Sequence, residues 1–144
     1  MSKPYVMLVD DEADFIETMS KRLQKREFKV LTATDGKSAL DLVSENRNLE
    51  VMILDVKMPG MDGLEVLAEM KKTYPLIEVI MLTGHATIES AIEGMKGGAF
   101  DYLMKPCEID QLVAKVEEAA EKKRTHAEKM EKARLERVMS SRGV

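Results

Sequence analysis

The stretch "YVMLVDDEADFIETMSKRL", residues 5–23, predicts a strand followed by a helix. Its first five residues are apolar and predict a buried β-strand. Apolar side chains then recur at the spacing of an amphipathic helix, at Phe15, Ile16, Met19 and Leu23. Three carboxylates lie between the two elements, at Asp10, Asp11 and Glu12. Because like charges repel one another when they are packed together, this crowding predicts that the strand end has a function.

The same strand–helix unit recurs five times along the chain. Apolar runs occupy residues 5–9, 29–33, 51–55, 78–82 and 100–104. Segments with helical spacing occupy residues 11–26, 35–45, 62–72, 86–98 and 108–123. This strict alternation predicts an α/β fold in which a parallel sheet lies between two layers of helices.

The composition of the runs indicates where each strand lies in the sheet. Residues 51–54 and 79–82 are apolar without alternation, as expected of strands that are covered on both faces. The run at 29–33 contains Lys29 and Thr32 and is typical of an edge strand. These properties fit a flavodoxin-like, doubly wound (βα)5 fold with the strand order 2-1-3-4-5, although composition alone does not fix the order.

The charge distribution divides the 144-residue chain into an acidic body and a basic tail. Residues 1–121 hold 14 Lys/Arg against 23 Asp/Glu, a net charge of -9, and residues 122–144 hold 8 against 3, a net charge of +5. We therefore predict one folded domain at 1–121, followed by a charged helical extension or linker at 122–144. The acidic body is a poor electrostatic match for nucleic acid, and the tail is too mixed in charge to predict binding to it.

The apolar stripe fades in the tail. Apolar side chains such as Ala127, Met130 and Val138 are too sparse there to form a core face. Acid-first pairs four residues apart favour an exposed helix, at Glu118–Lys122 and Glu128–Lys132. The simplest interpretation is that the last helix continues into solvent. The alternatives are a dimerising helix and the start of a linker to an output domain.

Cysteine usage and hydropathy indicate the cellular compartment in which the protein is expected. The single cysteine, Cys107, excludes an internal disulfide and favours a reducing environment. No secretory signal is recognisable, because the first apolar run is short and ends in acids. No run approaches the length of a membrane span. We therefore expect a cytoplasmic protein without a membrane partner.

The residues at the carboxyl ends of the inner strands predict a binding site. In such sheets ligands bind beyond these strand ends, which here carry Asp10 and Asp11, Asp55, Thr83 and Lys105. Three close carboxylates need a counter-charge, and oxygen ligands of this kind suit Mg²⁺. A cation, an ammonium and a hydroxyl beside a carboxylate would stabilise a phosphoryl group during transfer.

Four motifs together carry a family resemblance. "LVDDE" (8–12), "ILDVKMPGMDG" (53–63), "MLTGHA" (81–86) and "YLMKP" (102–106) follow one another in the order and spacing of a known domain. The set resembles the receiver domain of two-component response regulators, in the superfamily of the chemotaxis regulator. The resemblance covers roughly residues 4–121, and it is the combination that is specific.

The resemblance implies a phosphorylation site and a metal site. Asp55 matches the aspartate that accepts a phosphoryl group from the phosphohistidine of a histidine kinase. The implied ligands of Mg²⁺, which Mn²⁺ can replace, are Asp10, Asp11, Asp55 and the main-chain carbonyl of Lys57. Asp11 and Asp55 match direct ligands, and Asp10 matches an acid that usually acts through water.

The resemblance also implies a switch around the acids. Thr83 matches the hydroxyl that moves to the phosphoryl group, Lys105 the amine that pairs with it, and Tyr102 the aromatic that turns inward with Thr83. The bond before Pro106 matches one that is often cis. Lys57 and His85 occupy variable positions that tune the dephosphorylation rate in the family.

These matches imply a signalling switch that catalyses only its own phosphorylation and dephosphorylation. The implied partners are a sensor histidine kinase or phosphotransfer protein, and then a downstream protein or an attached output domain. A phosphorylation-dependent homodimer is also compatible. Residues 83–106 are similar to receivers of sigma-54 activators, so the chain is either a stand-alone regulator or the receiver of a longer transcriptional regulator. The chain as given has no ATPase or DNA-binding motif, so nucleic acid would be bound only through an output domain.

Other interpretations of the same residues stay open at this point. A phosphohydrolase of the haloacid-dehalogenase type also uses an aspartyl-phosphate, but it has a D-x-D pair where this chain has Asp55 and Lys57. A phosphorylation-independent interaction domain is the third class. Thr83 taken alone would be read as a helix cap, and Tyr102 as a core residue. Cys107, His85 and His126 form no recognisable metal site.

Overall fold

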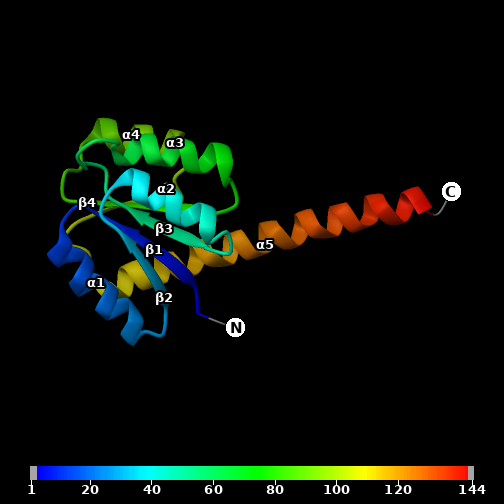
Figure 1. The fold of residues 1–144 in the computed structure, drawn as a ribbon, viewed down its shortest axis with the longest axis horizontal. Coiled ribbons are helices and arrows are strands. Elements are labelled where there is room, and N and C mark those ends of the chain that lie inside the picture. Colours follow the sequence, from blue (N-terminus) through cyan, green and yellow to red (C-terminus); the bar gives the residue numbers. More distant parts are fainter. Residues whose placement is uncertain (1–2, 143–144) are drawn as a thin grey trace.

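The computed structural model describes residues 3–142, in which five strands alternate with five helices (Figure 1). The strands are β1 (Tyr5–Val9), β2 (Lys29–Ala33), β3 (Val51–Leu54), β4 (Glu78–Thr83) and β5 (Asp101–Met104). The helices are α1 (Ala13–Lys25), α2 (Gly36–Glu45), α3 (Gly63–Thr73), α4 (Ile88–Lys96) and α5 (Ile109–Arg142). All strand pairs are parallel and the order is β2-β1-β3-β4-β5, which confirms the predicted fold class, strand order and edge position of residues 29–33.

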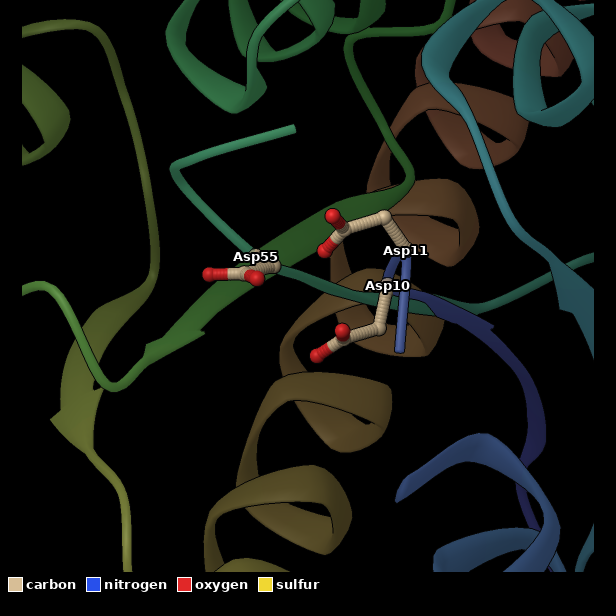
Figure 2. A group of neighbouring side chains, drawn as sticks. All are labelled: Asp10, Asp11 and Asp55. Atoms are coloured by element: carbon tan, nitrogen blue, oxygen red, sulfur yellow. The ribbon is translucent and has the colours of Figure 1, made fainter. Parts of the chain in front are cut away.

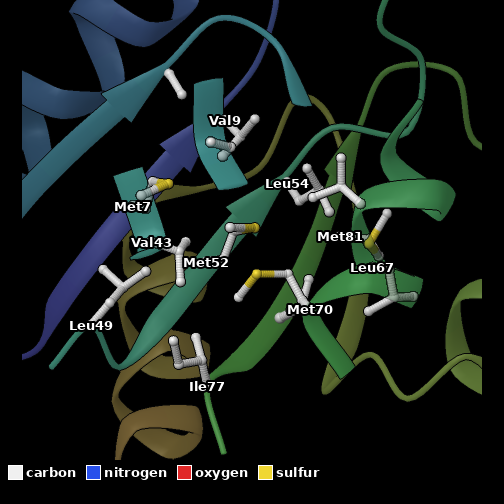
Figure 3. Close-up of a cluster of buried hydrophobic side chains, with 14 of the residues drawn as sticks. Met7, Val9, Val43, Leu49, Met52, Leu54, Leu67, Met70, Ile77 and Met81 are labelled. Atoms are coloured by element: carbon white, nitrogen blue, oxygen red, sulfur yellow. The ribbon is translucent and has the colours of Figure 1, made fainter. Parts of the chain in front are cut away.

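The sheet separates two hydrophobic clusters. One lies between the sheet and helices α2 and α3, and many of its side chains are shown in Figure 3. The other lies between the sheet and helices α1 and α5. Alternate residues of a strand point to opposite faces, so Met7 and Val9 enter the first cluster while Val6 and Leu8 enter the second. Burial on both faces accounts for the unbroken apolar runs of β1, β3 and β4.

Three strand boundaries differ by one residue from the apolar runs. β3 ends at Leu54 and leaves Asp55 just beyond it, β4 continues through Thr83, and β5 begins at Asp101. Main-chain hydrogen bonds continue beyond the end of β3 and before the start of β5, so the limits of the strands and of the apolar runs do not coincide. The amide of Asp55, for example, still donates to the carbonyl of Val9 over 3.0 Å.

Helix α5 is far longer than the other helices and projects away from the domain (Figure 1). Its buried positions in the second cluster end at Ala120, and its side chains from 128 to 141 are exposed. Residues 122–142 are thus the part of α5 that continues beyond the folded domain. Despite its length, neither α5 nor another helix within residues 3–142 is apolar enough to cross a membrane.

Candidate functional site

The predicted site residues meet at one edge of the sheet. Asp10 and Asp11 directly follow β1, Asp55 follows β3, Thr83 is the last residue of β4, and Lys105 follows β5. Parallel strands bring their carboxyl ends to the same edge, so residues that lie far apart in the sequence become neighbours. Figure 2 shows the three aspartates side by side at this edge.

The three aspartates form a group that can hold a cation. One carboxylate oxygen from each of Asp10, Asp11 and Asp55 lies within 4.8 Å of the other two. The side chain of Asp11 is exposed, whereas Asp10 and Asp55 are only 1% and 2% exposed. Within residues 3–142 no other group of three or more His, Cys, Asp or Glu side chains is arranged to hold a metal ion.

Lys105 provides positive charge inside this group. Its Nζ donates to Asp10 Oδ2 over 2.6 Å and to Glu12 Oε1 over 3.3 Å, and it lies 4.0 Å from Asp55 Oδ2. The ammonium also lies over the ring of Phe15, 3.9 Å from the ring centroid. Sequence reasoning missed these contacts of Glu12 and Phe15, although both residues lie in the stretch just after the acids.

Burial and hydrogen bonding oppose each other in the Asp10–Lys105 pair. Burial raises the pKa of Asp10, and this outweighs the lowering by the hydrogen bond from Lys105. Burial lowers the pKa of Lys105, but its hydrogen bond to Asp10 reverses this and leaves the pKa above its ordinary value. The ammonium is therefore charged at neutral pH and remains beside the acids.

Asp55 has one oxygen without a hydrogen-bond partner. Among the described residues, Asp55 Oδ1 is the only buried side-chain nitrogen or oxygen that lacks one. A buried polar atom in this state is rare and needs a reason, such as an ion or a reactive role. Three convergent carboxylates and a buried carboxylate oxygen fit a hard divalent cation that prefers oxygen ligands.

A tight loop holds the backbone of Asp55 in place. The amide of Gly63, the first residue of α3, donates to the carbonyl of Val56 over 2.7 Å. A Cβ at Gly63 would lie only 2.0 Å from the carbonyl oxygen of Asp55. The start of α3 is fixed by a capping box between Asp62 and Glu65. Glycine at 63 is thus required for the helix to begin against this edge of the sheet.

A shallow cleft opens from the acids to solvent. It is lined by Asp11, Glu12, Lys57, Met58, Pro59 and His85. The structure therefore brings the exposed side chains of Lys57 and His85 to the mouth of the site.

Thr83 is buried and does not cap the following helix. Its side chain is fully buried, and its Oγ1 accepts a hydrogen bond from the amide of His85 over 3.0 Å. Helix α4 is capped instead by Thr87, whose Oγ1 accepts from the amide of Ser90 over 2.9 Å. The capping interpretation of Thr83 is wrong, because four residues separate it from the helix.

Tyr102 connects β5 to α4. Its hydroxyl forms a 2.6 Å hydrogen bond with Ser90 Oγ, and its ring packs beside Gly94. The sequence analysis did not predict the contact of Ser90 with Tyr102, which joins residues 12 positions apart in two different elements. The peptide bond between Lys105 and Pro106 is cis.

The family model that describes the response regulator receiver domain matches residues 6–117. This chain belongs to the response regulator receiver family. The matched range contains all four motifs, and the receiver domain is a component of two-component regulatory systems.

Curated relatives extend beyond the receiver domain. The chain is 34% identical over 119 residues to the DNA-binding transcriptional regulator NtrC of Escherichia coli K12, covering 83% of this chain and 25% of NtrC. It is 39% identical over 123 residues to a putative NtrX-like response regulator of Rickettsia bellii, covering 84% of this chain and 26% of that protein. The chain thus spans about a quarter of the length of these relatives.

A solved receiver domain has the same fold. The structure of a response regulator receiver domain protein from Clostridium thermocellum superposes on this receiver with a TM-score of 0.81 at 36% identity. The similarity covers 85% of this chain and 98% of that one.

Proposed function

We propose that this receiver is a phosphorylation-activated switch in which Asp55 accepts a phosphoryl group from a phosphohistidine. The donor would be a sensor histidine kinase or a phosphotransfer protein in the cytoplasm. The observation that carries the proposal is the unpartnered Oδ1 of Asp55, at the open end of the sheet beside Asp10, Asp11 and Lys105.

In the proposed reaction a carboxylate oxygen of Asp55 attacks the phosphorus atom. A phosphorus–oxygen bond forms, the phosphorus–nitrogen bond breaks, and its electron pair returns to the imidazole of the donor. The ammonium of Lys105, 4.0 Å from Asp55 Oδ2, is near enough to neutralise charge on the transferred oxygens. Asp10 supports this role because its hydrogen bond holds Lys105 in the site.

Mg²⁺ is the proposed cofactor, and Mn²⁺ would replace it. Asp10, Asp11, Asp55 and the main-chain carbonyl of Lys57 would hold the ion. When bound, it would neutralise charge on the phosphoryl oxygens. We propose that the chain catalyses only its own phosphorylation and dephosphorylation, with Lys57 and His85 at the mouth of the cleft tuning the rate.

The proposed response starts at Thr83 and reaches the surface through α4. The hydroxyl of Thr83 would turn to the phosphoryl group, and Tyr102 would move with it and exchange its contact with Ser90. Helix α4 and β5 expose apolar side chains beside this path, at Ile88, Ile92, Met95 and Met104. This surface would bind a downstream protein, an output domain or a second receiver.

Labelling should require a divalent cation. Incubation with acetyl phosphate and Mg²⁺ should add the mass of one phosphoryl group to the protein, and excess EDTA should prevent it. Mg²⁺ at ten times its Kd should also stabilise the unmodified fold by about 1.4 kcal/mol, because it binds only the folded state. Intact-mass spectrometry and thermal unfolding measure the two effects.

Asp11→Asn should lose most of the Mg²⁺-induced stabilisation, whereas Asp41→Asn, an exposed acid on α2, should keep it. Equal labelling in Mg²⁺ and in EDTA would contradict a metal-dependent site.

Thr83→Ala should leave Asp55 able to accept the phosphoryl group but weaken the response. A switch from 1:99 to 99:1 needs about 5.5 kcal/mol, and one hydrogen bond to a charged group supplies roughly 1.5–3 kcal/mol. Loss of the Thr83 contact should therefore reduce the switching equilibrium constant by about tenfold or more. The measurement is the change in NMR shifts of α4 and β5 amides when beryllofluoride, a stand-in for the phosphoryl group, is added.

Thr32→Ala, at an exposed position on the edge strand β2, is the control and should respond like wild type. A full response in Thr83→Ala would argue against a switch that passes through this hydroxyl.

A further inference from the structure

The opposite end of the sheet holds a cluster of ion pairs that phosphoryl transfer does not use. Glu50 directly precedes β3, and Glu78 is the first residue of β4, so both lie at the amino ends of the strands. Both side chains are buried. Burying a carboxylate is costly unless it is paired and hydrogen-bonded, and here each of the two has a partner on the tail helix.

Glu50 connects the start of the sheet to Arg124. Its Oε1 accepts hydrogen bonds from the amide of Tyr5 over 3.0 Å and from Arg124 Nη2 over 2.8 Å, and its Oε2 accepts from Arg124 Nε. This bidentate contact fixes the orientation of the guanidinium as well as its position. The side chains of Glu50 and Arg124 are 12% and 25% exposed, so water screens the pair only partly.

Glu78 adds a second connection to the same part of the helix. Its Oε2 lies 3.5 Å from Lys122 Nζ, and its Oε1 lies 3.5 Å from Lys71 Nζ. Lys122 also lies over the ring of Phe100, 5.7 Å from the centroid. Arg124 and Lys122 therefore connect the sheet to the first turn of α5 that lies beyond the hydrophobic cluster.

The remainder of the helix lacks comparable support. From residue 128 to 141 its side chains are exposed, and the ion pair there, between Arg134 and Glu131, lies within the helix itself. Helices without tertiary packing are only marginally stable in water unless they continue from a formed segment. The last fixed turn therefore determines both the direction and the helicity of the residues beyond it.

We propose that Glu50 and Glu78, with Arg124 and Lys122, form a latch that sets the direction in which the tail helix leaves the receiver. The tail is then a rod with a fixed orientation relative to the sheet, and any partner bound to the tail is held in that orientation. The latch lies at the other end of the strands from Asp55. It does not depend on the proposed phosphoryl chemistry.

The charge states are compatible with a permanent latch at neutral pH. Burial raises the pKa of Glu50, but the hydrogen bonds from Arg124 and from the Tyr5 amide outweigh it and leave the pKa below the ordinary value. The hydrogen bond to Glu50 raises the pKa of Arg124. Both groups therefore stay charged.

Arg124→Gln tests the latch in the full chain, with Arg134→Gln as the matched control on the same helix. Two spin labels, attached at Ser44→Cys on α2 and Ser140→Cys on α5, report the distance between domain and tail. The native cysteine is removed by Cys107→Ser, and the labelled protein is diluted with unlabelled protein. The parent and Arg134→Gln should give one narrow distance distribution, and Arg124→Gln should give a broad one. Hydrogen exchange of the amides of residues 124–130 should be about tenfold faster in Arg124→Gln than in the parent, and unchanged in Arg134→Gln.

Arg124→Lys keeps the positive charge but not the bidentate geometry, so its distance distribution should have an intermediate width. Labelling of Asp55 should be unchanged in all variants, which separates failure of the latch from failure of the switch. An Arg124→Gln distribution as narrow as that of Arg134→Gln, with equal exchange, would overturn the proposal.

Discussion

Asp55→Asn is expected to abolish phosphoryl uptake from acetyl phosphate, while Asp41→Asn labels as wild type does. An amide is not an acceptor for the phosphoryl group, and no other carboxylate at this edge combines burial, an unpartnered oxygen and the nearby ammonium of Lys105. Asp41 is an exposed acid on α2 and controls for nonspecific labelling. Intact-mass spectrometry after incubation with Mg²⁺ measures the labelled fraction.

Misfolding should not explain the loss of labelling. Asp55→Asn removes one of three neighbouring carboxylates, so in the absence of Mg²⁺ it should relieve repulsion and unfold at a temperature no lower than wild type. Undiminished labelling of a folded Asp55→Asn protein would show that another residue accepts the group.

Gly63→Ala should destabilise the domain by about 3 kcal/mol. The added methyl group would lie 2.0 Å from the carbonyl oxygen of Asp55 and 2.8 Å from the Cα of Val56, so the backbone at the site must move. Overpacking in a tight environment typically costs about 1–3 kcal/mol, and backbone atoms yield less readily than side chains. The displacement should also slow labelling of Asp55, because its carboxylate shifts relative to Lys105.

Gly84→Ala is the matched control at the same edge of the sheet. The nearest neighbour of its added methyl group would be the side chain of Lys105 at 3.9 Å, an ordinary contact, so stability should change by less than about 0.5 kcal/mol. Urea unfolding of the two variants measures the difference. Equal stabilities would contradict the close approach of α3 to Asp55.

The sequence predicted which residues form the site better than it predicted the contacts between their side chains. Strand–helix alternation and the residues at the strand ends were enough to place Asp10, Asp55, Thr83 and Lys105 at one edge, because parallel strands end together. The continuation of β4 through Thr83 had no hydropathic signal, whereas the end of β3 coincides with the change from Leu54 to Asp55. The structure shows that the last helix runs to Arg142, well beyond its last buried position at Ala120.

Contacts between distant side chains could not be predicted from periodicity. The pair Glu50–Arg124 joins residues 74 positions apart, and neither residue belongs to a motif. The requirement for glycine at 63 depends on how closely α3 approaches Asp55, which spacing does not encode. The cap of α4 was different, since Thr87 is a residue type that favours the N-cap position and so carries a local signal, although the sequence analysis did not assign it that role.

The most direct test of the proposed switch is to locate the phosphoryl group. Wild-type protein labelled with acetyl phosphate and Mg²⁺ is treated with borohydride, which reduces a phosphorylated aspartate to homoserine, and is then digested and analysed by peptide mass spectrometry. We expect homoserine at position 55 and at no other aspartate, including the neighbouring Asp10 and Asp11. Reduction at another position, or labelled protein without reduction at 55, would contradict the account.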